Sequence, residues 1–193
     1  MFGISPFLVV ALALAALLIL WAVLTYNVLV KSRLRVDEAW STTDIQLKRR
    51  ASLVPNLAET VAGYASHERE TLEEVTRARQ QVQTAEGAQA AGAANAKLEQ
   101  ALGRLLVVVE RYPELKASTP FMALQAELSD LEAKIASARQ FYNRCVLEYN
   151  TSVARLPSSL IARVANFTAC SFFELEGPVE EPRVRFTQGR PGA

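Results

Sequence analysis

Every residue from Phe7 to Leu24 is apolar, and a densely charged stretch follows soon afterwards. The first thirty residues carry no charged side chain, whereas residues 31–50 carry nine. About 20 apolar residues at a rise of ~1.5 Å per residue cross a hydrocarbon core of about 30 Å. The pattern therefore predicts a transmembrane helix over residues 7–30, preceded by a short extracytoplasmic stub at residues 1–6.

A membrane anchor explains this segment better than a cleaved signal peptide or a buried core helix. Residues 1–6 contain no Lys or Arg, and no convincing cleavage site follows the apolar run. The run is also longer than the roughly 7–15 apolar residues of a signal peptide, and too uniformly apolar for a core helix. Trp21 and Tyr26 lie toward its C-terminal end, where aromatic rings settle at a membrane interface.

Basic residues after the apolar run predict its orientation. Lys31, Arg33 and Arg35 come first, and six basic residues against three acids give residues 31–50 a net charge of +3. Cytoplasmic flanks of membrane helices are enriched in Lys and Arg. We therefore expect the stub outside and the bulk of the chain in the cytoplasm. The basic cluster could also contact anionic lipid head groups, although a topology signal is the simpler interpretation.

Beyond residue 31, the apolar positions recur in alternating steps of three and four. One seam runs from Val36 to Tyr64, with Thr43 and Arg50 as its two members that break the apolar rule, and another runs from Phe121 to Ser152. This period is typical of helices that pack one stripe against neighbours. The pattern predicts an all-α fold, in which the transmembrane helix continues into a cytoplasmic antiparallel bundle of long helices.

Prolines, glycines and small residues suggest the boundaries of these helices. Pro55 should kink the first cytoplasmic helix without ending it. Residues 63–66 should loosen this helix before it continues over residues 67–82. Residues 84–96 are small and low in complexity, so we expect a connection there.

Two further long helices, one short helix and a tail are expected beyond this connection. The first covers about residues 95–111 and ends at Pro113. The second begins with Thr119 as its cap and Pro120 in its first turn, and Pro157 stops it near residue 156. A short helix follows at residues 159–164. The bundle domain as a whole is expected over residues 31–174, with an irregular tail at residues 175–193.

The composition argues against several functional classes. A net charge of +1 offers no basic excess for binding nucleic acid. Cys145 and Cys170 alone make no disulfide framework, which is consistent with a reducing compartment. The sequence has no phosphate-binding loop and no nucleophile-elbow motif. We therefore expect no cofactor, no metal and no enzymatic activity.

His67 is the single histidine and the only candidate general base near neutral pH. His67 and Glu68 begin like a zinc-protease motif, but Thr71 stands where the second metal-binding histidine would be. The competing hypothesis is an enzyme, a regulatory subunit or a ligand sensor. It would use His67, Glu68 and Arg139 in a polar cleft between helices.

Three consecutive basic residues at 48–50 cover most of a helix circumference, so at least one of them must face inward. The seam identifies this residue as Arg50. A buried guanidinium needs a partner. Acids on the last long helix could supply it: Glu127, Asp130, Glu132 and Glu148. A structural ion pair is the preferred interpretation, and a ligand site is the other.

Two Tyr–Asn pairs on the last long helix lie seven residues apart and so point the same way. They are Tyr142–Asn143 and Tyr149–Asn150. Hydrogen bonds between helices that fix their register are the preferred interpretation. A polar binding groove is the alternative.

Several motifs in order suggest a family. The chain contains YNVLVKSRLRVDEAW, DIQLKRRASLVPNLAETVAGYASHE, YPELKA, LEAKIASARQFYNRCVLEYN and LPSSLIA. From Tyr26 to about Glu174 they resemble the LemA family of bacterial membrane proteins. The resemblance implies a single-pass protein of the bacterial inner membrane with a cytoplasmic helical domain and no established enzymatic activity. Ser52 departs from the family, which usually has Asp there. Position by position, the resemblance nominates Arg49, Arg50, Pro55, Asn56, Tyr64, His67, Glu68, Arg139, Tyr142, Asn143, Tyr149 and Asn150.

The leading functional hypothesis is a non-enzymatic scaffold or docking protein anchored in the membrane. Its cytoplasmic bundle would self-associate into a homo-oligomer or bind a cytoplasmic protein partner. Many anchored bundles side by side could also organise or curve the lipid bilayer. Nucleic acid is not an expected partner.

Overall fold

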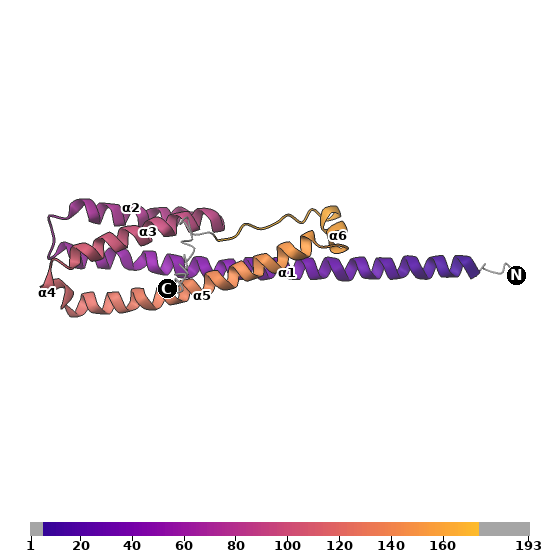
Figure 1. The fold of residues 1–193 in the computed structure, drawn as a ribbon, viewed down its shortest axis with the longest axis horizontal. Coiled ribbons are helices and arrows are strands. Elements are labelled where there is room, and N and C mark those ends of the chain that lie inside the picture. The colour runs from indigo at the N-terminus through magenta and orange to yellow at the C-terminus, as the bar shows by residue number, and fades with distance from the viewer. Residues whose placement is uncertain (1–5, 174–193) are drawn as a thin grey trace, which may run out of the picture.

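The computed structural model describes residues 6–173, and the described residues form six helices and no strand (Figure 1). The all-α prediction is confirmed. Residues 1–5 of the expected stub and the whole expected tail lie outside the described residues. The helices are α1 (Pro6–Ala62), α2 (Arg69–Thr84), α3 (Gly87–Val109), α4 (Pro113–Lys116), α5 (Thr119–Ala154) and α6 (Ser158–Val164).

Helix α1 is one continuous element that serves two environments. Its N-terminal part is long and apolar enough to cross a membrane, and none of its most apolar stretch is buried by the rest of the chain. The same helix continues through Pro55 to Ala62 and packs against α2, α3, α5 and α6. The predicted continuity between the membrane segment and the bundle is therefore present in the structure.

Four long helices, α1, α2, α3 and α5, form an antiparallel bundle in which the direction of the chain alternates (Figure 1). Helix α2 folds back along α1, α3 returns along α2, and α5 runs back along α1 toward the membrane segment. The two predicted seams supply the core faces of α1 and α5, and α2, α3 and α4 supply the rest of the core. Besides Arg50, its largest fully buried side chains are Leu29, Leu47, Val54, Leu57, Val61, Val75, Leu98, Leu105, Leu115, Phe121 and Tyr149.

The expected continuation of the first cytoplasmic helix over residues 67–82 is wrong, because the chain reverses after Ala62. Hydrogen bonds from Gly63 and Ala65 to the carbonyls of Glu59 and Val61 close the end of α1 at 3.2 and 2.8 Å. The reversal lets α2 bury its own apolar stripe in the core, which a straight extension would leave in water. It also turns Tyr64, the last member of the predicted seam, out into solvent.

The expected connection over residues 84–96 is also wrong, since α3 already begins at Gly87. Only residues 85–86 connect the two helices, and Gly87 adopts a left-handed φ of 79° that favours glycine. Ala88, Ala91 and Ala94 are buried. Alanine is the best helix former, and its small side chain lets α3 pack closely. The low bulk of this stretch therefore reflects close packing rather than a linker.

The last helices lie close to their expected bounds. Pro120 is in the first turn of α5 as predicted, but Thr119 is its first helical residue, and Ser118 precedes the helix without a side-chain cap bond. Helix α5 ends at Ala154, two residues before the expected end. Helix α6 begins one residue earlier than expected, and Pro113 opens the short helix α4.

Pro55 leaves one carbonyl of α1 without its usual helical partner. A proline has no N–H, so the carbonyl of Ala51 four residues earlier loses its hydrogen bond within the helix. Arg79 of α2 donates from Nε to this carbonyl at 3.2 Å. An arginine of the neighbouring helix thus satisfies the carbonyl and ties α2 to α1 at this level.

Replacing Arg79 should therefore be costly only while Pro55 is present. We expect Arg79→Met to lower the free energy of unfolding by about 1 kcal/mol, since it removes one hydrogen bond. In a Pro55→Ala background the loss should shrink, because residue 55 then supplies an N–H to Ala51. Unfolding of the detergent-solubilised protein measures all four members of this double-mutant cycle. Arg77→Met, at an exposed position of the same helix, is the control. Equal losses in both backgrounds would contradict this account.

Candidate functional site

Arg50 lies in the core with 0% of its surface exposed, as the seam predicts. Its Nη1 donates to Glu132 of α5, which is one of the four acids expected as partners. Its Nη2 donates to the side-chain oxygen of Asn95 and, at 3.3 Å, to the backbone carbonyl of the same residue on α3. Arg50 thereby joins three helices of the bundle. Asn95 was missed because it lies where the expected connection over residues 84–96 overlaps the start of the expected helix, with no inward position assigned to it.

This arrangement fits a structural role better than a ligand site. A buried charge is stable only when it is paired and hydrogen-bonded. Glu132 remains about half exposed, so the ion pair lies at the edge of the core. All three partner groups belong to the protein itself, and they fix the positions of α3 and α5 against α1.

Removing the charge of Glu132 should destabilise the bundle. We expect Glu132→Gln to lower the free energy of unfolding by about 2 kcal/mol, the usual contribution of a hydrogen bond to a charged group. Thermal and denaturant unfolding of the solubilised protein would measure this loss. Glu127→Gln, at an exposed position of the same helix, should leave the stability unchanged. A similar loss for both variants would rule out a specific role for the Arg50–Glu132 pair.

The segment at residues 167–173, which we call the strap, runs back along the bundle after α6 (Figure 1). Asn166 reverses the chain with a left-handed φ of 57°. The N–H groups of Asn166 and Phe167 donate to the carbonyls of Arg163 and Ala162 at 3.3 and 2.9 Å. This pair of bonds is the Schellman arrangement, in which Asn is an accepted alternative to Gly. This turn directs the strap back along α5.

The two Tyr–Asn pairs of α5 hold the strap by its backbone. Tyr142 and Tyr149 donate their hydroxyls to strap carbonyls at 2.8 and 2.9 Å. Asn143 and Asn150 each make two bonds, donating to one strap carbonyl and accepting from the N–H of the same strap residue. The six contacts are Tyr142–Ser171, Tyr149–Thr168, the paired bonds Asn143–Phe173 and the paired bonds Asn150–Cys170.

The spacing of the two pairs matches the geometry of a non-helical chain. Seven residues of helix span about 10.5 Å, and three residues of extended chain span about 10 Å. The two Tyr–Asn pairs, which are seven residues apart on α5, therefore contact strap residues that are three residues apart. The expected hydrogen bonds to another helix go to the strap instead, although the Tyr142 ring also packs edge-on against Trp40 of α1 at 5.6 Å. Every residue has a backbone carbonyl, so a sequence does not show which carbonyls act as acceptors. Only the seven-residue repeat of the Tyr–Asn pairs could have indicated this contact.

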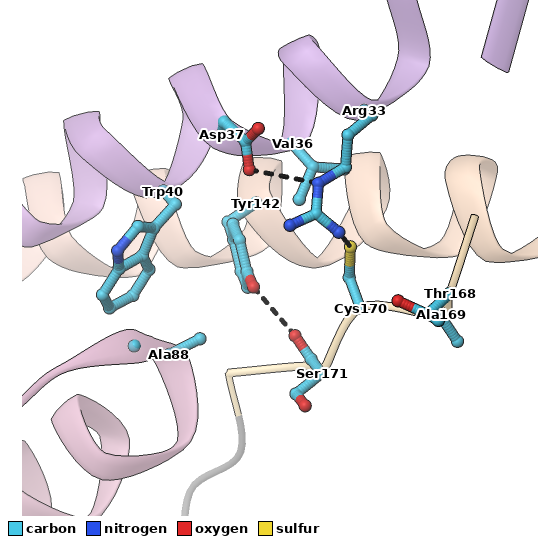
Figure 2. A pocket seen from close by; sticks show the side chains of 11 residues that line it. Arg33, Val36, Asp37, Trp40, Ala88, Tyr142, Thr168, Ala169, Cys170 and Ser171 are labelled. Carbon is cyan, nitrogen blue, oxygen red and sulfur yellow. Dashed lines mark hydrogen bonds and ion pairs between the residues drawn. The ribbon is translucent and has the colours of Figure 1, made fainter. Parts of the chain in front are cut away.

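A cavity of about 340 Å³ lies between the strap, α1, α5 and the start of α3 (Figure 2). Arg33, Asp37, Trp40, Tyr142 and Cys170 line it. Figure 2 shows the Arg33 guanidinium between Asp37 and Cys170. Its Nη1 lies 2.7 Å from the Cys170 Sγ, and its Nε lies 3.4 Å from an Asp37 oxygen. The charged groups of this cavity thus neutralise one another.

The predicted basic flank divides into different roles. Arg33 faces the strap, and its guanidinium also lies 5.7 Å from the centre of the Tyr149 ring. Arg35 is exposed and lies 3.8 Å from Glu148 of α5. Lys31 is exposed. Arg33 is therefore engaged within the protein, and the other two basic residues remain accessible.

The cavity is poorly suited to acid–base or nucleophilic chemistry. Burial raises the pKa of the Cys170 thiol, while Arg33 lowers it and Asp37 raises it. Burial likewise raises the pKa of the Tyr142 hydroxyl. A thiol with a raised pKa is protonated at neutral pH and is a weak nucleophile. Within residues 6–173, no three His, Cys, Asp or Glu side chains come together as metal ligands.

Breaking the Asn clamps should free the strap and expose its thiol. We expect the double variant Asn143→Ala, Asn150→Ala to raise the alkylation rate of Cys170 at least tenfold, since it removes four hydrogen bonds that each contribute about 1 kcal/mol. Mass spectrometry after timed treatment with a maleimide reports the rate, and the buried Cys145 is an internal reference. Asn56→Ala, at an exposed position on α1, is the control variant. An unchanged rate in the double variant would show that other contacts hold the strap.

The residues of the enzyme hypothesis are not brought together. His67 is exposed in the turn between α1 and α2, and Glu68 bonds Arg111 at 2.9 Å. Arg139 lies 20 residues into α5, or about 30 Å from the start of that helix. The start of α5 and the turn that carries His67 lie at the same end of the bundle (Figure 1). Arg49 and Asn56 are exposed on α1.

An exposed apolar helix that continues into a packed bundle defines a membrane-associated helical protein. The chain belongs to the LemA family, whose model matches residues 39–186. It is similar to the protein LemA of Metamycoplasma hominis, with 22% identity over 149 residues, covering 77% of this chain and 68% of that protein.

Two magnetosome proteins are also similar over a shorter segment. MamQ of Magnetospirillum gryphiswaldense is 32% identical over 73 residues, and MamQ 1 of Paramagnetospirillum magneticum is 31% identical over 74 residues. Each match covers 38% of this chain and 27% of the relative, so the chain spans about a quarter of the MamQ proteins. None of these names is that of an enzyme.

Proposed function

We propose that this protein is a non-enzymatic scaffold of the bacterial inner membrane, with its N-terminus outside and a cytoplasmic bundle that self-associates. One observation carries the proposal: the helix that would cross the membrane is also a member of the bundle, with no break between the two parts. A bundle attached in this way cannot pivot freely. Copies in contact would therefore impose their relative orientation on the bilayer, which suits a role in organising or curving it.

The polar groups of the bundle support this function over catalysis. Arg50, Arg79 and the Tyr–Asn pairs all bind other parts of the same chain. A ligand groove at the Tyr–Asn pairs would lie in the cavity beside Tyr142, where the charged side chains already pair with each other. The names of two relatives, magnetosome proteins, are compatible with a role in a membrane-bound assembly of this kind.

Self-association predicts a defined mass for the full-length protein. Light scattering after extraction in a mild detergent should give a discrete multiple of the chain mass, and cross-linking in the native membrane should trap the same number of copies. Agreement between the two measurements excludes an assembly that forms only in detergent. A monomer in both would contradict the scaffold and favour a module that docks a different protein.

A further inference from the structure

Helix α6 has an inverted distribution of side chains. It buries Ser159 and Ala162, whereas Leu160 and Val164, two of its three large apolar side chains, are exposed and Ile161 is partly buried. Leu156, Leu160 and Val164 recur every four residues, from just before the helix to its end, and are 73%, 56% and 84% exposed. Apolar side chains in water are unfavourable, so a row of three on one short corner of the chain indicates a surface that something apolar covers.

This corner lies beside the end of the membrane segment. Helix α6 packs against α1, and the Phe167 ring that follows it lies 5.8 Å from the ring of Tyr26. About 20 residues of helix cross a hydrocarbon core of about 30 Å, so a span that starts at Phe7 reaches the interface near Tyr26. Figure 1 shows α6 at the end of the bundle from which the exposed part of α1 projects.

The charge of the corner matches a lipid surface. Residues 149–173 contain two arginines, Arg155 and Arg163, and no acid. Both arginines are exposed: Arg155 directly precedes Leu156, and Arg163 directly precedes Val164. Short helices that lie in a membrane interface combine an apolar face with basic residues that contact anionic head groups.

We propose that the α6 corner, residues 155–164, is seated in the head-group layer of the membrane that α1 crosses. Leu156, Leu160 and Val164 enter the boundary with the acyl chains, and Arg155 and Arg163 contact anionic head groups. Lipid is the occupant that the surface fits, because it is continuous with the membrane segment. A stable dimer needs roughly 800 Å² buried on each partner, more than a seven-residue helix offers. The corner gives the bundle a second membrane contact, which fixes its tilt and does not depend on self-association.

The experiment places an environment-sensitive fluorophore on the full-length chain, in vesicles of phosphatidylcholine and phosphatidylglycerol. Leu160→Cys carries the probe in a Cys145→Ala, Cys170→Ser background whose melting temperature is compared with that of the unmodified chain. Val164→Cys is a second probe site on the same face, which keeps the test valid if one label disturbs folding. Val107→Cys, exposed on α3 at the far end of the bundle, is the aqueous control. Leu17→Cys in the apolar run is the membrane control.

Lipids with brominated acyl chains should quench the probes at positions 160 and 164 several-fold more strongly than the probe at position 107. Quenching at the level of position 107 would overturn the proposal. A blue-shifted probe that brominated lipid does not quench would also overturn it, because a second copy of the protein would then cover this face. The probe at position 17 reports whether α1 spans the bilayer, and the mass measurement reports self-association. Failure of either is therefore distinguishable from failure of the α6 contact.

Discussion

The structure depends on α1 being a single unbroken helix with two kinds of surface. Its N-terminal part presents apolar side chains all round, as a helix in lipid must, and its remainder presents one stripe to a protein core. The surface of α1 changes from apolar all round to one apolar stripe where other elements begin to cover the helix. Leu29 is already fully buried, Tyr26 contacts Phe167, and Val36 is in the core. The later helices are therefore placed relative to the apolar segment as soon as they are placed relative to α1.

The polar contacts of the bundle attach its other segments to α1, either directly or through α5. Arg50 attaches α3 and α5 through a buried charge, and Arg79 attaches α2 through the carbonyl that Pro55 leaves free. The Asn side chains of α5 attach the strap through otherwise unpaired backbone groups. A buried polar group without a partner costs free energy. Each contact therefore stabilises the one arrangement of segments that forms it and disfavours arrangements that leave its groups unpaired. Such contacts stabilise a fixed shape and leave few groups for chemistry.

Much of this fold could be predicted from the sequence, for identifiable reasons. A three–four seam shows which face of a helix is buried, and it identified the core faces of α1 and α5 and the inward direction of Arg50. A seam does not show the direction in which the chain runs, so the reversal after Ala62 was missed. Small residues are compatible with a linker or with close packing, and only the neighbouring helices decide between these. The strap was missed because it is held by its backbone, which every sequence shares.

The contacts around the strap also show that the membrane segment and the bundle are one structural unit. The family match begins at residue 39, but the cavity under the strap is lined by Arg33, Val36 and Asp37, which precede it. The partners of Arg33, which are Cys170 and Tyr149, lie within the matched region. A chain cut at residue 39 would keep the Tyr–Asn clamps and lose the cation that the strap covers. Residues on both sides of position 39 therefore pack together, and the packing shows no boundary there.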